Sequence, residues 1–401
     1  MTAGEVKSIY GGGYNGIDAF GGDDYEKVPD DARSTRAVVR GTAHVTVEGT
    51  AHVPACEQSE DASSAGSDPA AVHGGSFHST VAATEVVVGG QAKIETGARE
   101  NTGYGYGSLF GAGTNDIVLQ TTRVTLKDNA RIGHDDNKPG TSVISQGAFG
   151  NMTPLGYAAQ SRCYIGGAAF DYGSEIRNQN QAEYAATATI EGGQVDVLGV
   201  GPKSRSTKQA PKSVNGNVLL QQTGGTTAAI EASCIKEKKV TVTGNVDVKV
   251  LSGMISSYIM GKYPSYTTDG TIKGVTTLEL SGSGADGFHK IPLIETMDRV
   301  TVKEGAGIVV EGSWGVYDED GKYSGSGSAA VIKTIPFFRV RELAVEENAV
   351  LALTQKSLIE GNLIVNGQLN LKRSDGFAGL GAKVIAPVTA EGTASGAALV
   401  L

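Results

Sequence analysis

A short pattern of apolar and polar positions recurs along the chain: apolar–x–apolar, three residues, then apolar–x–apolar. VTVEGTAHV (residues 45–53) and LIVNGQLNL (residues 363–371) are two clear copies. Further copies begin at Val86, Val124, Ala188, Val240, Val300 and Leu343, and the copy at Ala188 has one extra residue in its middle. Side chains alternate between the two faces of a β-strand. Each copy therefore predicts two short strands that share one apolar face.

The three residues between the paired strands predict a turn. They read EGT, GGQ, KDN, TGN, KEG, EEN and NGQ in the seven regular copies. Gly and Asn enter left-handed backbone conformations at low cost, which tight turns require. The apolar runs on either side are too short, and too often β-branched, to predict helices.

The spacing of the copies predicts a solenoid. Successive copies start 41, 38, 64, 52, 60, 43 and 20 residues apart, mostly near multiples of about 20. A unit of that length cannot bury its apolar face alone and must stack on its neighbours. We therefore predict a parallel β-helix of roughly 14 to 16 coils, on the order of 70 Å long. Its continuous core would contain Val45, Val86, Val124, Val240, Val300 and Leu343. A β-sandwich is the alternative, because regularly spaced short strands also suit that fold.

Glycine-rich stretches follow apolar pairs at several places. IYGGG at residues 9–13 is echoed by LFGAG (109–113), YIGGA (164–168) and VLGVG (197–201). No amphipathic helix follows any of them, which argues against a P-loop or a dinucleotide-binding fingerprint. We interpret these glycines as bends where a Cβ atom would clash with the coils above and below.

One glycine-rich stretch and one repeat copy resemble a known family. SIYGGGYNG and NLIVNGQLNL resemble large adhesin-like surface proteins of bacteria, which belong to the broad pectin-lyase-like group. The resemblance extends over most of the chain and implies an all-β fold, a right-handed parallel β-helix (solenoid) with loop insertions. It also implies an extracellular location on the bacterial cell surface, with residues 1–401 as one elongated domain excised from a longer, secreted protein. Residues 133–187 are less regular, and EIRNQNQAEYAA within them is compatible with a short helix.

Composition narrows the possible partners. Lys and Arg total 34 against 43 Asp and Glu, so the net charge of -9 argues against binding nucleic acid. No apolar run approaches the roughly 20 residues that span a bilayer, so we expect no membrane insertion. The start MTAGEVKSIY lacks the features of a signal peptide, which suits either a cytosolic protein or an excised piece. Three widely separated cysteines predict neither a zinc site nor a disulfide scaffold. We expect a monomer.

The insertions between repeats are where binding would occur, because loops on a rigid scaffold carry function. Two insertions are rich in aromatic residues, at 254–270 and 314–328. We predict a sugar-stacking surface, because aromatic rings suit the apolar faces of sugars. Its candidate residues are Trp314, Tyr317, Tyr323, Tyr263 and Tyr266. The alternatives are a hairpin tip at 314–328 and buried packing at 254–270. The expected partner is a glycan or a host surface protein.

The remaining clusters of polar residues are interpreted as structural, and not as catalytic or metal-binding groups. His73 and His78 are interpreted as solvated loop residues, and His134, Asp135 and Asp136 as turn-capping residues. Residues 201–213 are interpreted as a basic loop that contains Lys203, Arg205, Lys208 and Lys212. We predict no catalytic residue, no metal site and no cofactor. An adhesin-like module or a spacer stalk is favoured over an enzyme. The enzymatic alternative is a β-helical polysaccharide lyase or glycoside hydrolase.

Overall fold

The structure is a computed structural model that describes most of the chain, with gaps. The described residues are 1–6, 8–12, 38–54, 71–76, 79–94, 108–113, 116–132, 164–166, 174–200, 212–232, 240–262, 270–284, 287, 289–310, 338–353, 357–371, 383–384, 388–389 and 398–400.

Within these residues the secondary structure consists of β-strands and contains no helix. The first strands are β1 (Ser8–Tyr10), β2 (Val38–Val47), β3 (His52–Val53), β4 (Ala71–His73), β5 (Thr80–Val88), β6 (Lys93–Ile94), β7 (Ser108–Phe110), β8 (Ile117–Val118), β9 (Thr122–Leu126), β10 (Arg131–Ile132) and β11 (Tyr164–Gly166). The middle strands are β12 (Glu175–Ile176), β13 (Tyr184–Ile190), β14 (Gln194–Gly199), β15 (Lys212–Val214), β16 (Asn217–Gln222), β17 (Thr226–Glu231), β18 (Val240–Val242), β19 (Val246–Val250), β20 (Met254–Met260), β21 (Gly270–Ile272) and β22 (Thr276–Leu280). The last are β23 (His289–Ile291), β24 (Ile294–Val302), β25 (Gly307–Val310), β26 (Phe338–Val345), β27 (Val350–Leu353), β28 (Ser357–Ile359), β29 (Leu363–Val365), β30 (Gln368–Leu371), β31 (Lys383–Val384), β32 (Val388–Thr389) and β33 (Ala398–Val400).

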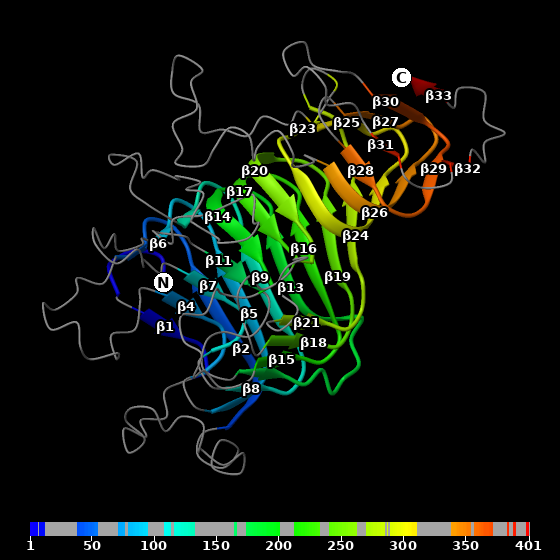
Figure 1. Cartoon of the computed structure of the whole chain (residues 1–401). Coiled ribbons are helices and arrows are strands. Elements are labelled where there is room, and N and C mark those ends of the chain that lie inside the picture. The colour runs from blue at the N-terminus through cyan, green and yellow to red at the C-terminus, as the bar shows by residue number, and fades with distance from the viewer. Residues whose placement is uncertain are drawn as a thin grey trace, which may run out of the picture.

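The strands form one long curled sheet and one small sheet (Figure 1). The long sheet has 28 strands, and the small sheet contains β23, β25, β27, β30 and β33. Strands far apart in the sequence lie side by side and pair in parallel, for example β2 with β5 and β5 with β9. The fold is therefore all-β with a long parallel sheet, as expected of a parallel β-helix or another β-solenoid.

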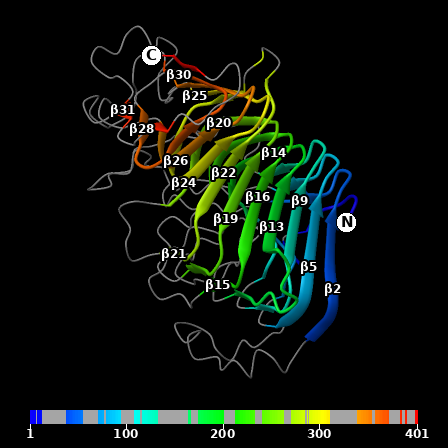
Figure 2. The same cartoon turned by 90° about the vertical axis from the view of Figure 1, so that its right-hand side faces the viewer.

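One row of strands runs the length of the molecule, and we call it row 1 (Figure 2). It contains β2, β5, β9, β13, β16, β19, β22, β24, β26, β29 and β32. The paired inward residues of row 1 are Val45, Val86, Val124, Ala188, Leu220, Val248, Leu278, Val300, Leu343 and Leu363. The backbone of Val388 continues this line beside Leu363. Each coil of the chain therefore contributes one strand to row 1.

The chain passes from row 1 through further rows before it returns. Row 2 contains β3, β6, β10 and the first residues of β14, β17 and β20. Row 3 contains β1, β4, β7, β11, the last residues of β14, β17 and β20, the first residues of β24 and β26, and then β28 and β31. Row 4 contains the first residues of β2 and β5, then β8, β12, β15, β18 and β21.

Alternate side chains of these strands form one core. Strand β19 shows the pattern clearly, with Val246, Val248 and Val250 buried and the two residues between them partly exposed. Of the residues predicted to point inward, Val45, Val86, Val124, Val300 and Leu343 all belong to a single hydrophobic cluster. The prediction of a continuous core is confirmed for these five. The side chain of Val240 lies outside the described residues.

The turns that follow row 1, toward row 2 or toward the small sheet, have the predicted left-handed residue in several coils. Gly49, Gly90 and Gly305 have φ angles of 64°, 65° and 72°. Asp128 and Asn348 take the same role with φ angles of 59° and 58°. Asp128 also accepts a hydrogen bond at 2.9 Å from the backbone N–H of Gly90 in the preceding coil. These two turns are thus stacked on, and bonded to, one another.

The glycine-rich stretches also behave as predicted. The segments that begin at Ile9, Leu109, Tyr164 and Val197 all lie in row 3. A Cβ atom on Gly11 would lie 2.5 Å from the carbonyl oxygen of Gly74 in the next coil. Real Cβ atoms do not approach backbone so closely. The opening glycines are therefore required by the close approach of stacked coils.

The predicted coil length is wrong. Val45 pairs directly with Val86, 41 residues later, and Val124 pairs directly with Ala188, 64 residues later. Leu343 and Leu363 are only 20 residues apart and also pair directly. A long gap thus contains one coil with an insertion and not two or three short coils. Row 1 has the eleven described strands named above, fewer than the predicted 14 to 16 coils.

The prediction for one repeat copy is also wrong, because its first strand does not lie in row 1 as the first strands of the other copies do. VTVTGNVDV at residues 240–248 places Val240–Val242 in row 4, where this strand pairs with β15 and β21. The second half of the copy, from Val246, lies in row 1 and pairs with β16 and β22. Its local alternation matches that of the other copies, so the pattern alone could not distinguish the two rows.

The short helix considered for EIRNQNQAEYAA is wrong as well. Its first two residues form β12, and strand β13 begins at Tyr184. Between them, Asn178 and Gln181 have positive φ angles of 49° and 52°. The side chain of Asn178 accepts a hydrogen bond from the N–H of Ala182 and donates one to its carbonyl oxygen, both at 3.0 Å. This segment is a bend closed by an asparagine side chain.

The shape of the coil changes near residue 290. Row 4 ends at β21 in the described part of the chain. Strand β24 runs directly from row 3, at Ile294 and Glu295, into row 1, at Arg299 to Val302. The register shifts between Glu295 and Met297, and Thr296 there has a φ of 57°. A β-branched residue rarely adopts a positive φ, so this corner is a strained point in the backbone.

Candidate functional site

The long insertions attach to row 3. Those that enter it are residues 54–70, 95–107, 133–163, 311–337 and 372–382. Those that leave it toward row 4 are residues 11–37, 167–174, 200–211, 232–239 and 261–269. The turns from row 1 to row 2 are short by comparison, such as residues 48–51. Row 3 is therefore the part of the scaffold from which inserted segments leave the coils.

The outward side of row 3 contains unusual polar residues. The inward residues Val72, Leu109, Ile230 and Ile259 belong to the hydrophobic cluster, so their neighbours in each strand point outward. These neighbours include His73, Glu231 and Glu295, which are only 1%, 3% and 5% exposed. Burial of ionisable groups is costly, and such groups concentrate at functional sites. We take this outward side as the candidate site.

At the N-terminal end of the site, His73 lies between two aromatic rings. It stacks on Tyr10 with ring centroids 4.3 Å apart, and on Phe110 at 5.4 Å. The three residues come from three successive coils, which pair as Tyr10 with His73 and His73 with Phe110. Burial lowers the pKa of His73 from 6.5 to about 3. The imidazole is therefore neutral in the folded protein at ordinary pH.

The neutral state of His73 predicts an acid-sensitive contribution to stability. The unfolded chain takes up a proton on this residue below pH 6.5, and the folded chain does so only near pH 3. Between those values the contribution of His73 falls with decreasing pH by about 1.4 kcal/mol per unit. His73→Phe continues the aromatic stack and removes this term. From pH 7 to pH 5.5, the stability of the variant relative to the parent should therefore rise, as measured by urea unfolding.

A parallel shift of parent and variant with pH would contradict the burial of a neutral His73. Because other groups also titrate in this window, the difference between the two proteins is the quantity to follow. His44→Phe is a matched control, since His44 lies exposed on row 1. Its stability relative to the parent should not change with pH to the same degree.

Farther along row 3, Glu231 and Tyr258 form a buried pair. The hydroxyl of Tyr258 donates a hydrogen bond to Oε1 of Glu231 in the preceding coil. Tyr258 has no exposed surface. The phenol thus holds one carboxylate in a fixed position on the outward side of the row.

Glu295 lies two coils beyond Glu231. The row passes from Glu231 to Met260 and then to Glu295. With coils about 4.8 Å apart, the two glutamates have backbones roughly 10 Å apart. Burial raises the pKa of Glu295 from 4.5 to about 7, and the charge of Arg339 in the next coil partly opposes this rise. Arg339 itself is paired with Glu360 at 2.9 Å. Glu295 therefore exchanges a proton near neutral pH, as a general acid or base must.

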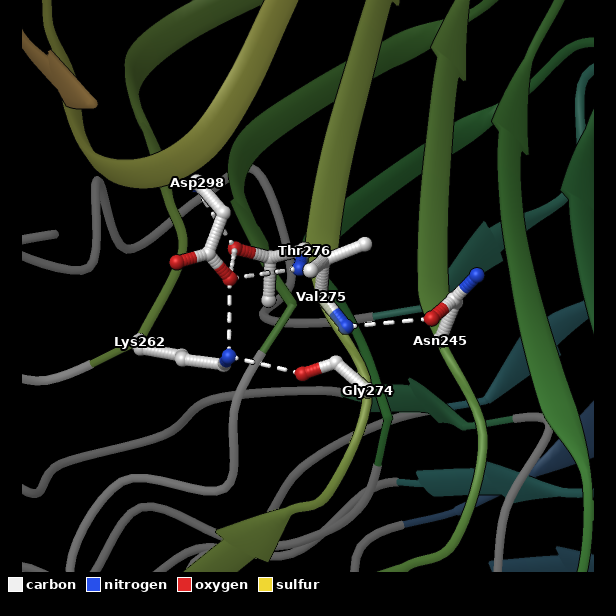
Figure 3. A network of polar contacts seen from close by, with 6 residues as sticks. All are labelled: Asn245, Lys262, Gly274, Val275, Thr276 and Asp298. Atoms are coloured by element: carbon white, nitrogen blue, oxygen red, sulfur yellow. Dashed lines mark hydrogen bonds and ion pairs between the residues drawn. The ribbon is translucent and has the colours of Figure 1, made fainter. Parts of the chain in front are cut away.

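A polar network holds the strand that carries Glu295 (Figure 3). Oδ2 of Asp298 contacts Nζ of Lys262 at 2.8 Å and accepts the backbone N–H of Thr276 at 2.8 Å. Lys262 also donates to the carbonyl oxygen of Gly274 at 2.7 Å. In the coil before, Oδ1 of Asn245 accepts the N–H of Val275 at 3.0 Å. These contacts satisfy backbone groups at the corner where row 4 ends, and they hold β24 next to β22.

The predicted sugar-stacking residues are not placed by the structure. Trp314, Tyr317, Tyr323, Tyr263 and Tyr266 all lie outside the described residues. The segments that contain them, however, attach to row 3 at β26 and β20. The basic residues Lys203, Arg205 and Lys208 lie outside the described residues too, as do His78, His134, Asp135 and Asp136. Lys212, also assigned to the basic loop, is instead the first residue of strand β15.

Two interpretations of loops need correction. His73 is not a solvated loop residue, because it belongs to β4 and is buried. Residues 254–260 are not an insertion, because they form β20. Sequence reasoning also missed Glu231 and Glu295. Both occupy the position that Tyr10 and Phe110 take in the glycine-rich stretches, and an alignment of row 3 would have shown the substitution of a charge there.

Comparison with known proteins assigns this chain to no family. No protein-family model, no curated protein and no solved structure matches it. No helix that could cross a membrane occurs in the described part of the chain. The same residues include no group of three or more His, Cys, Asp or Glu side chains placed to hold a metal ion.

Proposed function

We propose that this chain is a right-handed parallel β-helix, a single elongated domain of an extracellular bacterial surface protein, and that it binds glycan or a host surface. The observation that carries the proposal is the attachment of the aromatic insertions to row 3. Residues 261–269 follow β20 and residues 311–337 precede β26, and both strands contribute to row 3 on either side of β24. Inserted aromatic residues on a rigid, repetitive scaffold suit recognition of sugars.

The solvent-facing side of row 1 supports the role of a scaffold. It has charged residues that pair between neighbouring coils, such as Arg299 with Glu342 at 3.0 Å and Lys249 with Glu279 at 3.9 Å. Exposed pairs of this kind contribute little stability each. They do keep a long sheet face hydrated, which suits a stalk that holds other domains away from the cell.

A polysaccharide lyase or glycoside hydrolase is the second candidate, and the glutamates of row 3 favour it. Inverting glycosidases place two carboxyl groups about 6.5 to 9.5 Å apart, one protonated and one ionised. Glu231 and Glu295 point to the same side two coils apart, and the pKa of Glu295 is raised to about 7. Their burial, with exposed fractions of 3% and 5%, counts against this function, because a substrate must reach both carboxyl groups.

A glycan array and a sugar-release assay distinguish the functions. We expect the parent to bind a defined set of glycans, Trp314→Ala to lose binding, and no reducing or unsaturated ends to be released. Thr46→Ala is the control, because Thr46 is exposed on row 1, and it should bind like the parent. Sugar release by the parent that Glu295→Gln abolishes would establish the enzyme instead. Neither binding nor release would leave the spacer function.

A further inference from the structure

The corner of β24, where row 3 passes directly into row 1, is held firmly on one side. Thr296 has a φ of 57° there, and its Oγ1 is buried with no hydrogen-bond partner among the described residues. In the preceding coil, the N–H of Gly261 donates to the carbonyl oxygen of Glu295 at 2.8 Å, and the N–H of Lys262 donates to that of Thr296 at 3.0 Å. A Cβ atom on Gly261 would collide with the backbone of Thr296. The strained corner is therefore fixed toward the N-terminal coils.

On its other side the corner faces a charged group that lies between two coils. Glu295 pairs in register with Arg339 of the next coil, and both side chains point outward from row 3. Arg339 donates from Nε at 3.1 Å and from Nη2 at 2.9 Å to Oε1 of Glu360, in the coil after that. Neighbouring strands lie about 4.8 Å apart, so either carboxyl group is within reach of the guanidinium group. Arg339 thus lies between two carboxyl groups and is bonded to one of them.

The carboxyl group of Glu295 depends on Arg339 when it is ionised. Glu295 is 5% exposed, and in the described part of the chain no donor hydrogen-bonds to its side chain. Its neighbour in the preceding coil, Met260, is uncharged. Burial raises the pKa of Glu295 to about 7, and the charge of Arg339 opposes this rise. The other charged groups of the surrounding strands are Asp298 with Lys262, Arg299 with Glu342, Glu231 with Tyr258, and exposed Arg341.

We propose that this corner is a pH-sensitive joint, in which ionised Glu295 takes Arg339 from Glu360. With Glu295 protonated, Arg339 bonds to Glu360, as in the structure. Once Glu295 loses its proton, its buried charge is strongly unfavourable without a counter-charge, and Arg339 bonds to it instead. The side-chain link from β26 to Glu360 is then lost, so the coil at residues 357–371 opens more readily. The unfolded chain loses the proton of Glu295 above pH 4.5 and the folded chain only near pH 7, so the contribution of this group to stability falls between those values.

Hydrogen exchange of the full chain at pH 6 and pH 8, followed by mass spectrometry and corrected for intrinsic rates, tests the joint. In the parent we expect several-fold less protection of residues 357–371 at pH 8, and unchanged protection of residues 240–250. Glu295→Gln should keep the high protection at both pH values, because this side chain no longer ionises. Glu360→Gln should have the low protection already at pH 6, because Arg339 then has no carboxylate to bond in that coil. Glu342→Gln is the matched control and should behave like the parent, since Glu342 pairs with Arg299.

Three outcomes would overturn the joint. The first is equal protection of residues 357–371 in the parent at pH 6 and pH 8. The second is a loss of protection with pH that persists in Glu295→Gln, which would assign the change to another group. The third is a loss that persists in Glu360→Gln, which would show that Arg339 is not exchanged between the two carboxyl groups. Glu360 is exposed, so its variant decides the question even if Glu295→Gln does not fold.

Discussion

Val242→Asp prevents the chain from folding stably at room temperature. Val242 is 1% exposed and belongs to the hydrophobic core, where it pairs with Val214 and Ile272 in the coils on either side. A carboxylate there is buried against apolar neighbours and has no partner for its charge. Such a change costs more than about 4 kcal/mol, which is a large fraction of the stability of a typical domain. Circular dichroism and urea unfolding measure the loss.

Thr241→Asp is the matched control. Thr241 is the adjacent residue of the same strand, and its side chain is partly exposed on the opposite face. We expect a change within about 1 kcal/mol, because the charge remains hydrated. Equal effects of the two substitutions would show that the inward face of β18 has been assigned wrongly.

Gly225→Ala produces the second large effect. Gly225 has a φ of 66° in the turn between rows 1 and 2. An added Cβ atom would lie 2.7 Å from the backbone carbon of Gly192 and 2.7 Å from the carbonyl oxygen of Gly193, in the coil before. The left-handed conformation and the backbone clash together cost about 3 kcal/mol. Urea unfolding of the variant and the parent gives the difference.

Gly41→Ala shows whether the turn is responsible. Gly41 is exposed in β2, its φ is not in the left-handed region, and an added Cβ would meet no atom within 4 Å. Its substitution should change stability by less than about 0.5 kcal/mol. A loss at Gly41 as large as that at Gly225 would contradict the stacking of turns described above.

Local structure was predictable because it depends on short-range alternation and turn chemistry. The inward positions at Val45 and Leu343, and the left-handed turn residues Gly49 and Asn348, follow from nine-residue patterns alone. The order of strands across coils does not. Val240 and Val246 have the same local pattern, yet they belong to rows 4 and 1. Their rows depend on which segments pair across insertions of variable length.

The candidate site was harder to predict for a related reason. The outward residues of a half-buried strand are expected to be solvated, and Glu231 and Glu295 occupy such positions. They are nevertheless 3% and 5% exposed, which strand periodicity cannot indicate.

The central structural claim is that each repeat forms one coil, however long the insertion within it. Spin labels on exposed residues of row 1 test this most directly by electron resonance distance measurement. His44, Glu85, Arg123, Thr187, Leu219, Asp247, Thr277 and Arg299 occupy one continuous line of paired residues. We therefore expect about 34 Å between labels at His44 and Arg299, and about 24 Å between Arg123 and Arg299. Distances of about 60 Å and 42 Å, as coils of uniform 20-residue length would give, would contradict the fold described here.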